Sequence, residues 1–326
     1  MQITRRTTIA GGLAALAAAI APTARAAADW SPPEPDRELR VKVRGGSIYV
    51  RVNGPLDARA APALFIHGGP GSGHAYFLPA LQMADRRAII LYDSLDAGLS
   101  DRPGDPANWT VERFVSEVDA IRAALDLDRL HLVGQSWGGT VALEYGARVP
   151  GGLRSLTLSS PLVSTRSWEA STRAQLATLP EDVQAVINSH EVAGTTGDPA
   201  YAAAMDIFYA HFLARHRPPA YVTAYRERTG IRLNPLVYNA MWGPGEIRAT
   251  GSLRDYDGEP LLPRLSVPVL AIAGDHDEMT PDALRPLVAR IPEGRLAIIA
   301  DSGHSTFGDQ PAQVIALLRD HFGQTD

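Results

Sequence analysis

A short glycine-rich segment near the middle of the chain places a serine where it can act as a nucleophile. The segment reads Gly134-Gln135-Ser136-Trp137-Gly138 and matches the pattern G-x-S-x-G. It follows the apolar run at residues 130–133 and precedes a helical pattern, so a sharp strand-to-helix turn is expected at the serine. Such a turn strains the central residue and brings backbone close on both sides, which favours glycine at the flanking positions. We therefore expect the Ser136 hydroxyl to be exposed at the carboxyl end of the strand, near the positive end of the helix dipole.

A serine nucleophile needs a general base, and the base needs an acid that orients it. Of the nine histidines, His304 is the best candidate because it follows the last predicted strand, in a loop that can reach Ser136. For the acid, residues 273–277 (AGDHD) follow another predicted strand. Asp277 is preferred to Asp275, whose alternative role is a loop carboxylate that caps a turn. The order Ser136, Asp277, His304 matches the order of nucleophile, acid and base in α/β hydrolases.

Backbone N–H groups are expected to stabilise the oxyanion that forms when the serine attacks a carbonyl. The segment His67-Gly68-Gly69-Pro70-Gly71 follows an early strand, at the place that supplies one such N–H group in lipase-like enzymes. We assign this group to Gly69, which has no Cβ to obstruct the substrate oxygen, and the second to Trp137. His67 is expected to brace the loop rather than to take part in the chemistry.

An alternating series of strands and helices must carry these residues. Residues 39–43 and 48–52 alternate apolar and polar side chains around Gly45-Gly46, which predicts an antiparallel hairpin. A helix is expected after Thr110, its N-cap. Continuous apolar runs are typical of strands buried on both faces of a parallel sheet. They occur at residues 63–66, 88–92, 130–133, 153–158, 267–273 and 296–299. The pattern predicts an α/β fold with a mostly parallel central sheet flanked by helices.

The chain is expected to divide into a hydrolase core and a helical insertion. The strand candidates lie in residues 29–161 and 252–326, which we assign to the core. Residues 162–251 show helical periods, including residues 200–215 and 219–228, and few strand candidates. We therefore predict that residues 162–251 form a helical cap between two strands of the sheet.

The first 28 residues have the layout of an export signal that is cleaved. Arg5-Arg6 precedes an apolar run at residues 9–21, which ends in small residues with possible cleavage after Ala26 or Ala28. A helix of this length reaches about 20 Å, short of the ~30 Å hydrocarbon core of a membrane. The paired arginines resemble a twin-arginine signal, and the alternative is an ordinary export signal. The mature protein is expected to be periplasmic or secreted, bacterial, and without a membrane segment.

Composition excludes several other classes of function. Lys and Arg number 31 against 36 Asp and Glu, a net charge of −5, so no positive field is available for nucleic acid. The chain has no cysteine, which excludes disulfides, zinc-thiolate sites and cysteine nucleophiles. His211 and His216 are five residues apart on an expected helix, whereas a zinc pair is spaced i, i+4. We expect neither a metal nor an organic cofactor.

The motifs together resemble the proline iminopeptidase family of α/β hydrolases, which includes amino-acid amidases. The resemblance rests on residues 67–71 and on residues 134–140 (GQSWGGT). It continues through residues 238–246 (YNAMWGPGE) and 250–257 (TGSLRDYD) to the carboxyl end, and so covers nearly all of the mature chain. Members of this family remove N-terminal residues from peptides or hydrolyse amino-acid amides.

The resemblance also implies a site for the free α-amine of the substrate. Family members bind this amine with two glutamates, and the matching positions here are Glu246 and Glu278. A free α-amine has a pKa of about 7.7–8.0, so it is largely cationic at neutral pH and needs compensating carboxylates in a partly buried site. The alternative for each glutamate is a solvated surface carboxylate.

One loop departs from the family pattern. The family usually has a Tyr-Asp-Gln-x-Gly-x-Gly-x-Ser run after its second parallel strand, whereas this chain has Ser94 in place of the glutamine and Asp96 in place of a glycine. Asp96 either adds negative charge near the amine pocket or caps a turn, and the turn is the preferred interpretation. We expect this departure to affect which substrates are preferred, and not whether the protein catalyses hydrolysis.

The residues and the resemblance predict a serine hydrolase that forms an acyl-enzyme. It would cleave the amide or peptide bond after an N-terminal residue with a free α-amine, in a small peptide or an amino-acid amide. An esterase or lactonase would keep the same three residues but gain nothing from the two glutamates. An epoxide or haloalkane hydrolase would need an aspartate at position 136. A non-catalytic binding protein is the remaining alternative, and the complete set of nucleophile, acid and base argues against it.

Overall fold

The computed structural model describes residues 30–326, and the predicted export signal lies outside them. Within residues 30–326 the strands form one eight-stranded sheet in the order β1-β2-β4-β3-β5-β6-β7-β8. β1 and β2 form the predicted antiparallel hairpin, β2 also runs antiparallel to β4, and all other pairs are parallel. The strands are β1 (Arg37–Val43), β2 (Gly46–Asn53), β3 (Ala63–Ile66), β4 (Ile89–Asp93), β5 (Leu130–Gln135), β6 (Leu153–Ser159), β7 (Val269–Gly274) and β8 (Gly294–Ile299). The α/β architecture expected from the apolar runs is confirmed.

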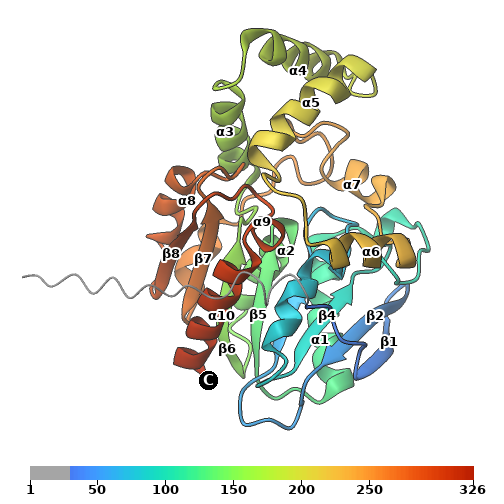
Figure 1. Ribbon diagram of the computed structural model, residues 1–326, viewed down its shortest axis with the longest axis vertical. Helices are drawn as coiled ribbons and strands as arrows, with labels where there is room; N and C mark the ends of the chain where they lie inside the picture. The colour runs from blue at the N-terminus through green and yellow to red at the C-terminus, as the bar shows by residue number, and fades with distance from the viewer. Residues whose placement is uncertain (1–29) are drawn as a thin grey trace, which may run out of the picture. The chain divides into compact units, whose positions relative to one another are not determined.

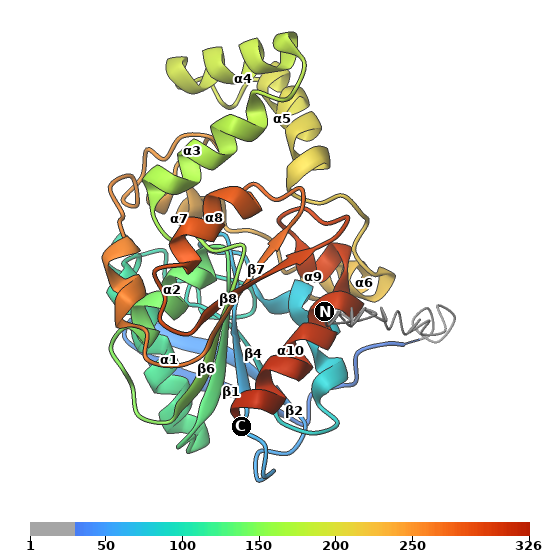
Figure 2. The ribbon, with the colours of Figure 1, turned by 90° about the vertical axis from the view of Figure 1, so that its left-hand side faces the viewer.

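Helices cover both faces of the sheet (Figures 1 and 2). On one face α1 (Val111–Leu125) packs against α2 (Trp137–Gly146). On the other face α10 (Pro311–Thr325) packs against the 3₁₀ helix η1 (His74–Met83), which also contacts the short helix α9 (Thr306–Asp309). The central strands are buried on both sides for this reason, and β3, β4 and β5 have no exposed residue. Thr110 caps α1 as predicted, because its side chain accepts a hydrogen bond from the Arg113 N–H at 3.3 Å.

Five helices lie between β6 and β7, within the segment predicted to be a helical insertion. They are α3 (Thr165–Leu176), α4 (Glu181–Ala193), α5 (Pro199–Phe212), α6 (Ala220–Thr229) and α7 (Pro235–Met241). Figure 1 shows α3, α4 and α5 projecting beyond the carboxyl ends of the parallel strands. α4 and α5 enclose a small apolar cluster of their own, which includes Ile187 and Phe208. The limits of the insertion at residues 162 and 251 stay a prediction.

The helix predicted over residues 200–215 is wrong at its carboxyl end. α5 ends at Phe212, so His216 does not share a helix with His211. The Asp309 carboxylate accepts hydrogen bonds from the backbone N–H groups of Arg215 and His216, at 3.2 and 2.9 Å, and these groups therefore cannot continue the helix. β7 likewise begins at Val269, two residues later than predicted, just after Pro268, which has no N–H group to donate to a neighbouring strand.

Among residues 30–326, no helix is both long enough and apolar enough to cross a membrane. Residues 1–28, on which the export prediction rests, lie outside this range.

Candidate active site

Ser136 occupies the turn between β5 and α2 in a backbone conformation that L-residues rarely adopt. Its φ is 55° and its ψ is −122°. A Cβ built on Gly134 would lie 2.1 Å from the Gly138 carbonyl oxygen, and a Cβ built on Gly138 would lie 2.1 Å from the Ile66 carbonyl oxygen. The two flanking glycines are therefore required by close backbone approach, as expected from the motif.

His304 follows β8, and its imidazole contacts the Asp277 carboxylate. The His304 Nδ1 atom is 3.0 Å from Asp277 Oδ1, and both side chains are buried. The His304 N–H donates to the Phe212 carbonyl oxygen at the end of α5, at 2.8 Å, which fixes the loop against the helical insertion. Asp275 instead accepts hydrogen bonds from the backbone N–H groups of residues 301 and 302 and so closes the turn that leads to His304. The structure thus brings Asp277, rather than Asp275, to the histidine.

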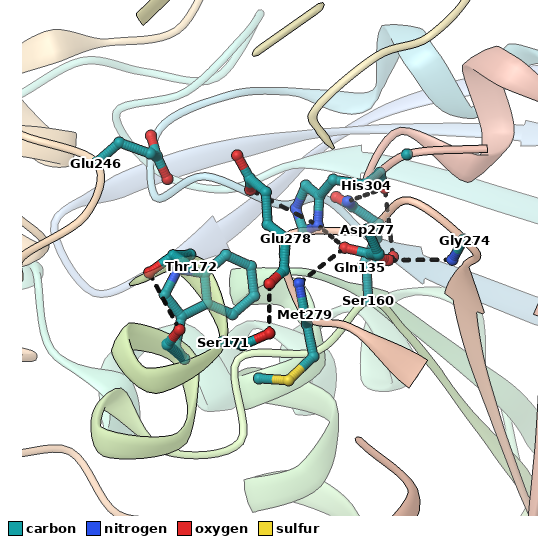
Figure 3. A network of polar contacts seen from close by, with 12 residues as sticks. Gln135, Ser160, Ser171, Thr172, Glu246, Gly274, Asp277, Glu278, Met279 and His304 are labelled. Carbon is teal, nitrogen blue, oxygen red and sulfur yellow. Dashed lines mark hydrogen bonds and ion pairs between the residues drawn. The ribbon is translucent and has the colours of Figure 1, made fainter. Parts of the chain in front are cut away.

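Further hydrogen bonds hold the Asp277 carboxylate in place (Figure 3). Asp277 Oδ2 accepts from Ser160 Oγ at 2.5 Å and from the Gly274 N–H at 3.2 Å, and Oδ1 accepts from the Met279 N–H at 3.1 Å. Sequence reasoning missed Ser160. The available signal was its position directly after β6, the strand next to β5, because neighbouring parallel strands end at the same edge of the sheet.

A second hydrogen-bonded chain links the segments that converge on the serine. The Gly68 N–H donates to the Tyr76 hydroxyl at 2.5 Å, and this hydroxyl donates to Gln135 Oε1 at 2.9 Å. Gln135 Nε2 in turn donates to the His304 carbonyl oxygen at 3.3 Å. The chain ties the glycine-rich loop after β3, the turn that carries Ser136 and the His304 loop into one unit. Sequence analysis missed Tyr76 in this role.

A cavity of about 400 Å³ opens beside Ser136 and His304. Ser136 and His304 both line it, and the two predicted glutamates line it from separate segments. The charged and polar side chains that line it include Ser136, Tyr209, Arg226, Glu246, Glu278 and His304. The cavity therefore brings together a hydroxyl, an imidazole and two carboxylates.

Glu278 is buried beside the imidazole of His304. Its Oε2 atom is 3.9 Å from His304 Nδ1, and its Oε1 atom has no hydrogen-bond partner among residues 30–326. The Glu278 backbone carbonyl accepts from Ser171 Oγ of α3 at 2.6 Å, so the insertion helps to hold this segment (Figure 3). A buried carboxylate oxygen without a donor is costly, and it marks a position that a hydrogen-bond donor of a ligand would satisfy.

Glu246 faces the same space from the loop after α7. Its Oε2 atom accepts hydrogen bonds from the Tyr209 and Tyr238 hydroxyls at 3.0 and 2.9 Å. The backbone of this loop is held by the insertion, because the Glu246 N–H donates to the Tyr201 hydroxyl at 3.3 Å and that hydroxyl donates to Glu191 at 2.6 Å. Sequence reasoning assigned no role to these tyrosines, which lie on α5 and α7.

The buried carboxylates of the site raise the pKa of His304. Burial alone would lower the pKa of His304, but the negative charges of Asp277, Glu278 and Glu246 outweigh it and raise the pKa to about 9. Burial, with Glu246 as a second cause, raises the pKa of Glu278 well above its ordinary value, and burial also raises the pKa of Glu246. A cation bound between the glutamates would relieve this excess of negative charge.

The two residues predicted to stabilise an oxyanion lie beside the serine. Gly69 and Trp137 line a small recess together with Ser136. Trp137 is the first residue of α2, so its N–H has no partner within the helix. Gly69 has a φ of 38°, and a Cβ there would make an ordinary 3.5 Å contact with Leu233. Its backbone conformation, rather than crowding by the protein, is the reason for glycine at this position.

The loop that departs from the family pattern is braced internally. Asp96 has a φ of 66°, and its carboxylate accepts from the Trp109 indole N–H and from the Gly104 N–H, both at 2.8 Å. The Ser94 N–H donates to His67 Nε2 at 3.1 Å, so His67 braces two loops. Neither Ser94 nor Asp96 lines the cavity, and the turn interpretation of Asp96 agrees with this geometry.

Comparison with known proteins places this geometry in a family. The sequence pattern of the alpha/beta hydrolase fold matches residues 62–311. The chain is 37% identical to the proline iminopeptidase of Heyndrickxia coagulans over 260 residues, which cover 79% of this chain and 89% of that protein. It is 38% identical to the proline iminopeptidase of Levilactobacillus brevis over 287 residues, which cover 86% of this chain and 95% of that protein.

A solved structure agrees over a similar length. The proline iminopeptidase of Mycobacterium smegmatis superposes with a TM-score of 0.79 at 34% identity, covering 89% of this chain and 98% of that one. The agreement therefore extends to the insertion as well as to the sheet. The chain belongs to the α/β hydrolases and, within them, to the proline iminopeptidase family.

Proposed function

We propose that this protein is a serine hydrolase that cleaves the amide or peptide bond after an N-terminal residue with a free α-amine. The observation that carries the proposal is the placement of Glu246 and Glu278 in the same cavity as Ser136 and His304. Glu278 Oε1, which has no hydrogen-bond partner among residues 30–326, supports the proposal. An ammonium group would supply this oxygen with a hydrogen-bond donor and with a compensating positive charge. The names of the relatives support the same substrate class.

The chemistry assigned to the site is acyl transfer in two steps. The Ser136 hydroxyl attacks the scissile carbonyl, and His304 takes its proton and passes it to the leaving amine. Water then attacks the acyl-enzyme with His304 again as the base, and the acid product and free Ser136 result. The 3.0 Å contact with Asp277 keeps the His304 proton on Nδ1, which leaves Nε2 as the acceptor for the serine proton.

The oxyanion formed in each step is assigned to the N–H groups of Gly69 and Trp137. Loss of one such donor typically costs about 10²–10³ in kcat. The substrate amine is assigned to Glu246 and Glu278, and removal of one partner of a buried ion pair costs about 3–5 kcal/mol. The helical cap, residues 162–251, supplies Glu246 and its tyrosines and closes over the acyl side chain.

Matched chromogenic anilides of proline, alanine and phenylalanine, each with a free and with an acetylated amine, test the proposal. We expect turnover of the free-amine series alone, and the ranking within it reports the preferred N-terminal residue. Equal turnover of both series, or turnover of simple esters alone, would contradict the proposal and favour a general esterase. A fluorophosphonate probe that leaves Ser136 unlabelled in the folded protein would contradict the assigned nucleophile.

A further inference from the structure

Arg226 is a charged group in the cavity that the proposed reaction has not used. It lies on α6, its side chain is half-buried, and it lines the cavity together with Ser136 and Glu278. Among residues 30–326 its guanidinium makes neither a hydrogen bond nor an ion pair. Burial lowers the pKa of Arg226, yet a guanidinium stays protonated in proteins. A half-buried cation without a partner indicates a position for an anionic group of a ligand.

Arg226 lines the cavity from a different element than either glutamate. α6 packs against η1, and Tyr76 of η1 is the titratable side chain that influences Arg226. Glu278 lies in the loop after β7, and its backbone carbonyl accepts a hydrogen bond from Ser171 of α3. Neither Glu246 nor Glu278 is within ion-pair distance of Arg226. The cavity is therefore lined by two carboxylates, by a guanidinium that forms no ion pair with them, and by Ser136.

We infer that Arg226 binds the free carboxylate of the leaving amino acid, so that the enzyme prefers dipeptides to longer or C-terminally blocked substrates. The inference rests on the proposed function, since the amine must be held at Glu246 and Glu278. A dipeptide carries an ammonium and a carboxylate on either side of its single peptide bond, and its extended length is at most about 7 Å. Each further residue moves the carboxylate about 3.5 Å away. A guanidinium matches a carboxylate in charge and in planar geometry.

The test compares the dipeptide prolylalanine with its C-terminal amide and with the proline anilide. We expect the native protein to prefer the dipeptide to its amide. Arg226→Gln should lower kcat/KM for the dipeptide by about tenfold to a hundredfold, mainly through KM, and should change the value for the amide far less. Arg226→Lys should restore part of the loss, because it keeps the charge without the planar fork.

Arg228→Gln is the matched control on the same helix. Arg228 is exposed, forms a 3.6 Å ion pair with Glu34 and lies over the Tyr225 ring. Its replacement removes one positive charge from α6 away from the cavity, and we expect the preference for the dipeptide to remain. Equal losses on dipeptide and amide in Arg226→Gln would overturn the inference and leave Arg226 with a structural role.

The remaining outcomes separate the inference from the proposed function. Turnover of the free-amine anilide without any preference of the native protein for dipeptide over amide overturns the inference alone. Failure to turn over any free-amine substrate overturns the proposed function and the inference together. Binding of prolylalanine to the Ser136→Ala protein, measured by calorimetry, gives an independent readout. Equal affinity for dipeptide and amide there also counts against the role of Arg226.

Discussion

Replacing Glu278 by glutamine should lower the pH at which His304 becomes an effective base. His304 must be neutral to accept the proton of Ser136, and neighbouring carboxylates raise the pKa of His304 to about 9. The rate of serine modification should therefore rise as pH increases through about 9 and fall below it. Glutamine has nearly the shape of glutamate without the charge. The imidazolium then loses one stabilising neighbour, and the midpoint must move toward lower pH.

The 3.9 Å separation between Glu278 Oε2 and His304 Nδ1 sets the size of the shift. At this distance two unit charges interact by about 1 kcal/mol in water and by about 4 kcal/mol at the effective dielectric constant of about 20 that suits protein sites. One pKa unit corresponds to about 1.4 kcal/mol. The midpoint should therefore fall by between about one and three pH units, less where Glu278 is already protonated.

The assay is the rate of fluorophosphonate labelling of Ser136 between pH 5 and 10. This probe carries no amine, so its reaction does not depend on amine binding at the glutamates. Glu293→Gln is the control, since Glu293 is exposed and directly precedes β8, at the end of that strand remote from its carboxyl end. We expect the control to keep the native midpoint. A native midpoint in Glu278→Gln would refute the electrostatic reasoning, and an upward shift would show that Glu278 does not act on His304 through its charge.

Three further changes probe separate parts of the site. Glu246→Gln should depress kcat/KM for free-amine anilides by at least tenfold more than for simple esters, and an equal loss on both would contradict amine binding. Ser160→Ala removes the 2.5 Å hydrogen bond to Asp277 and should lower kcat about tenfold with little change in KM, whereas a pure KM effect would argue against orientation through Asp277. Gly138→Ala places a Cβ 2.1 Å from the Ile66 carbonyl oxygen, and a Tm within about 2 °C of the native value would contradict the close packing.

Matched controls separate these effects from general damage. Gly151→Ala adds the same methyl group where nothing lies within 4 Å, so its Tm should stay close to the native value. Ser189→Ala removes a hydroxyl that bonds only to the Val186 carbonyl oxygen within the exposed helix α4, and kcat should not change. A loss in either control would point to a non-specific effect of the substitution.

The fold could be predicted well because its signal is local. Alternating apolar and polar residues located the two hairpin strands, apolar runs bounded by Gly, Pro or Asp located the other strands, and Thr110 marked the start of α1. One error occurred where a distant side chain decides the outcome. α5 ends at Phe212 because Asp309, almost one hundred residues away, takes the next backbone N–H groups. Periodicity within a window carries no information about such a partner.

The supporting residues of the site were missed for the same reason. The glycine-rich turn fixes Ser136 through close backbone contacts that its own glycines permit, so the motif alone located it. Ser160, Tyr209 and Tyr238 act through hydrogen bonds to residues on other elements. Their residue types are common on surfaces and in cores, and only the three-dimensional arrangement distinguishes them. Arg226 likewise becomes informative through the absence of a partner, which no sequence pattern encodes.

The two glutamates link recognition of the amine to the strength of the base. The carboxylates that would hold the substrate ammonium are among those that raise the pKa of His304. A bound ammonium offsets part of their negative charge, so the pKa of His304 falls and the neutral imidazole that accepts a proton is more populated near neutral pH. An acetylated substrate brings no charge and leaves the imidazole protonated. Selectivity for the free amine should therefore appear in kcat as well as in KM. The difference in kcat between free and acetylated esters should narrow as pH rises through about 9, and a constant difference across that range would contradict the link.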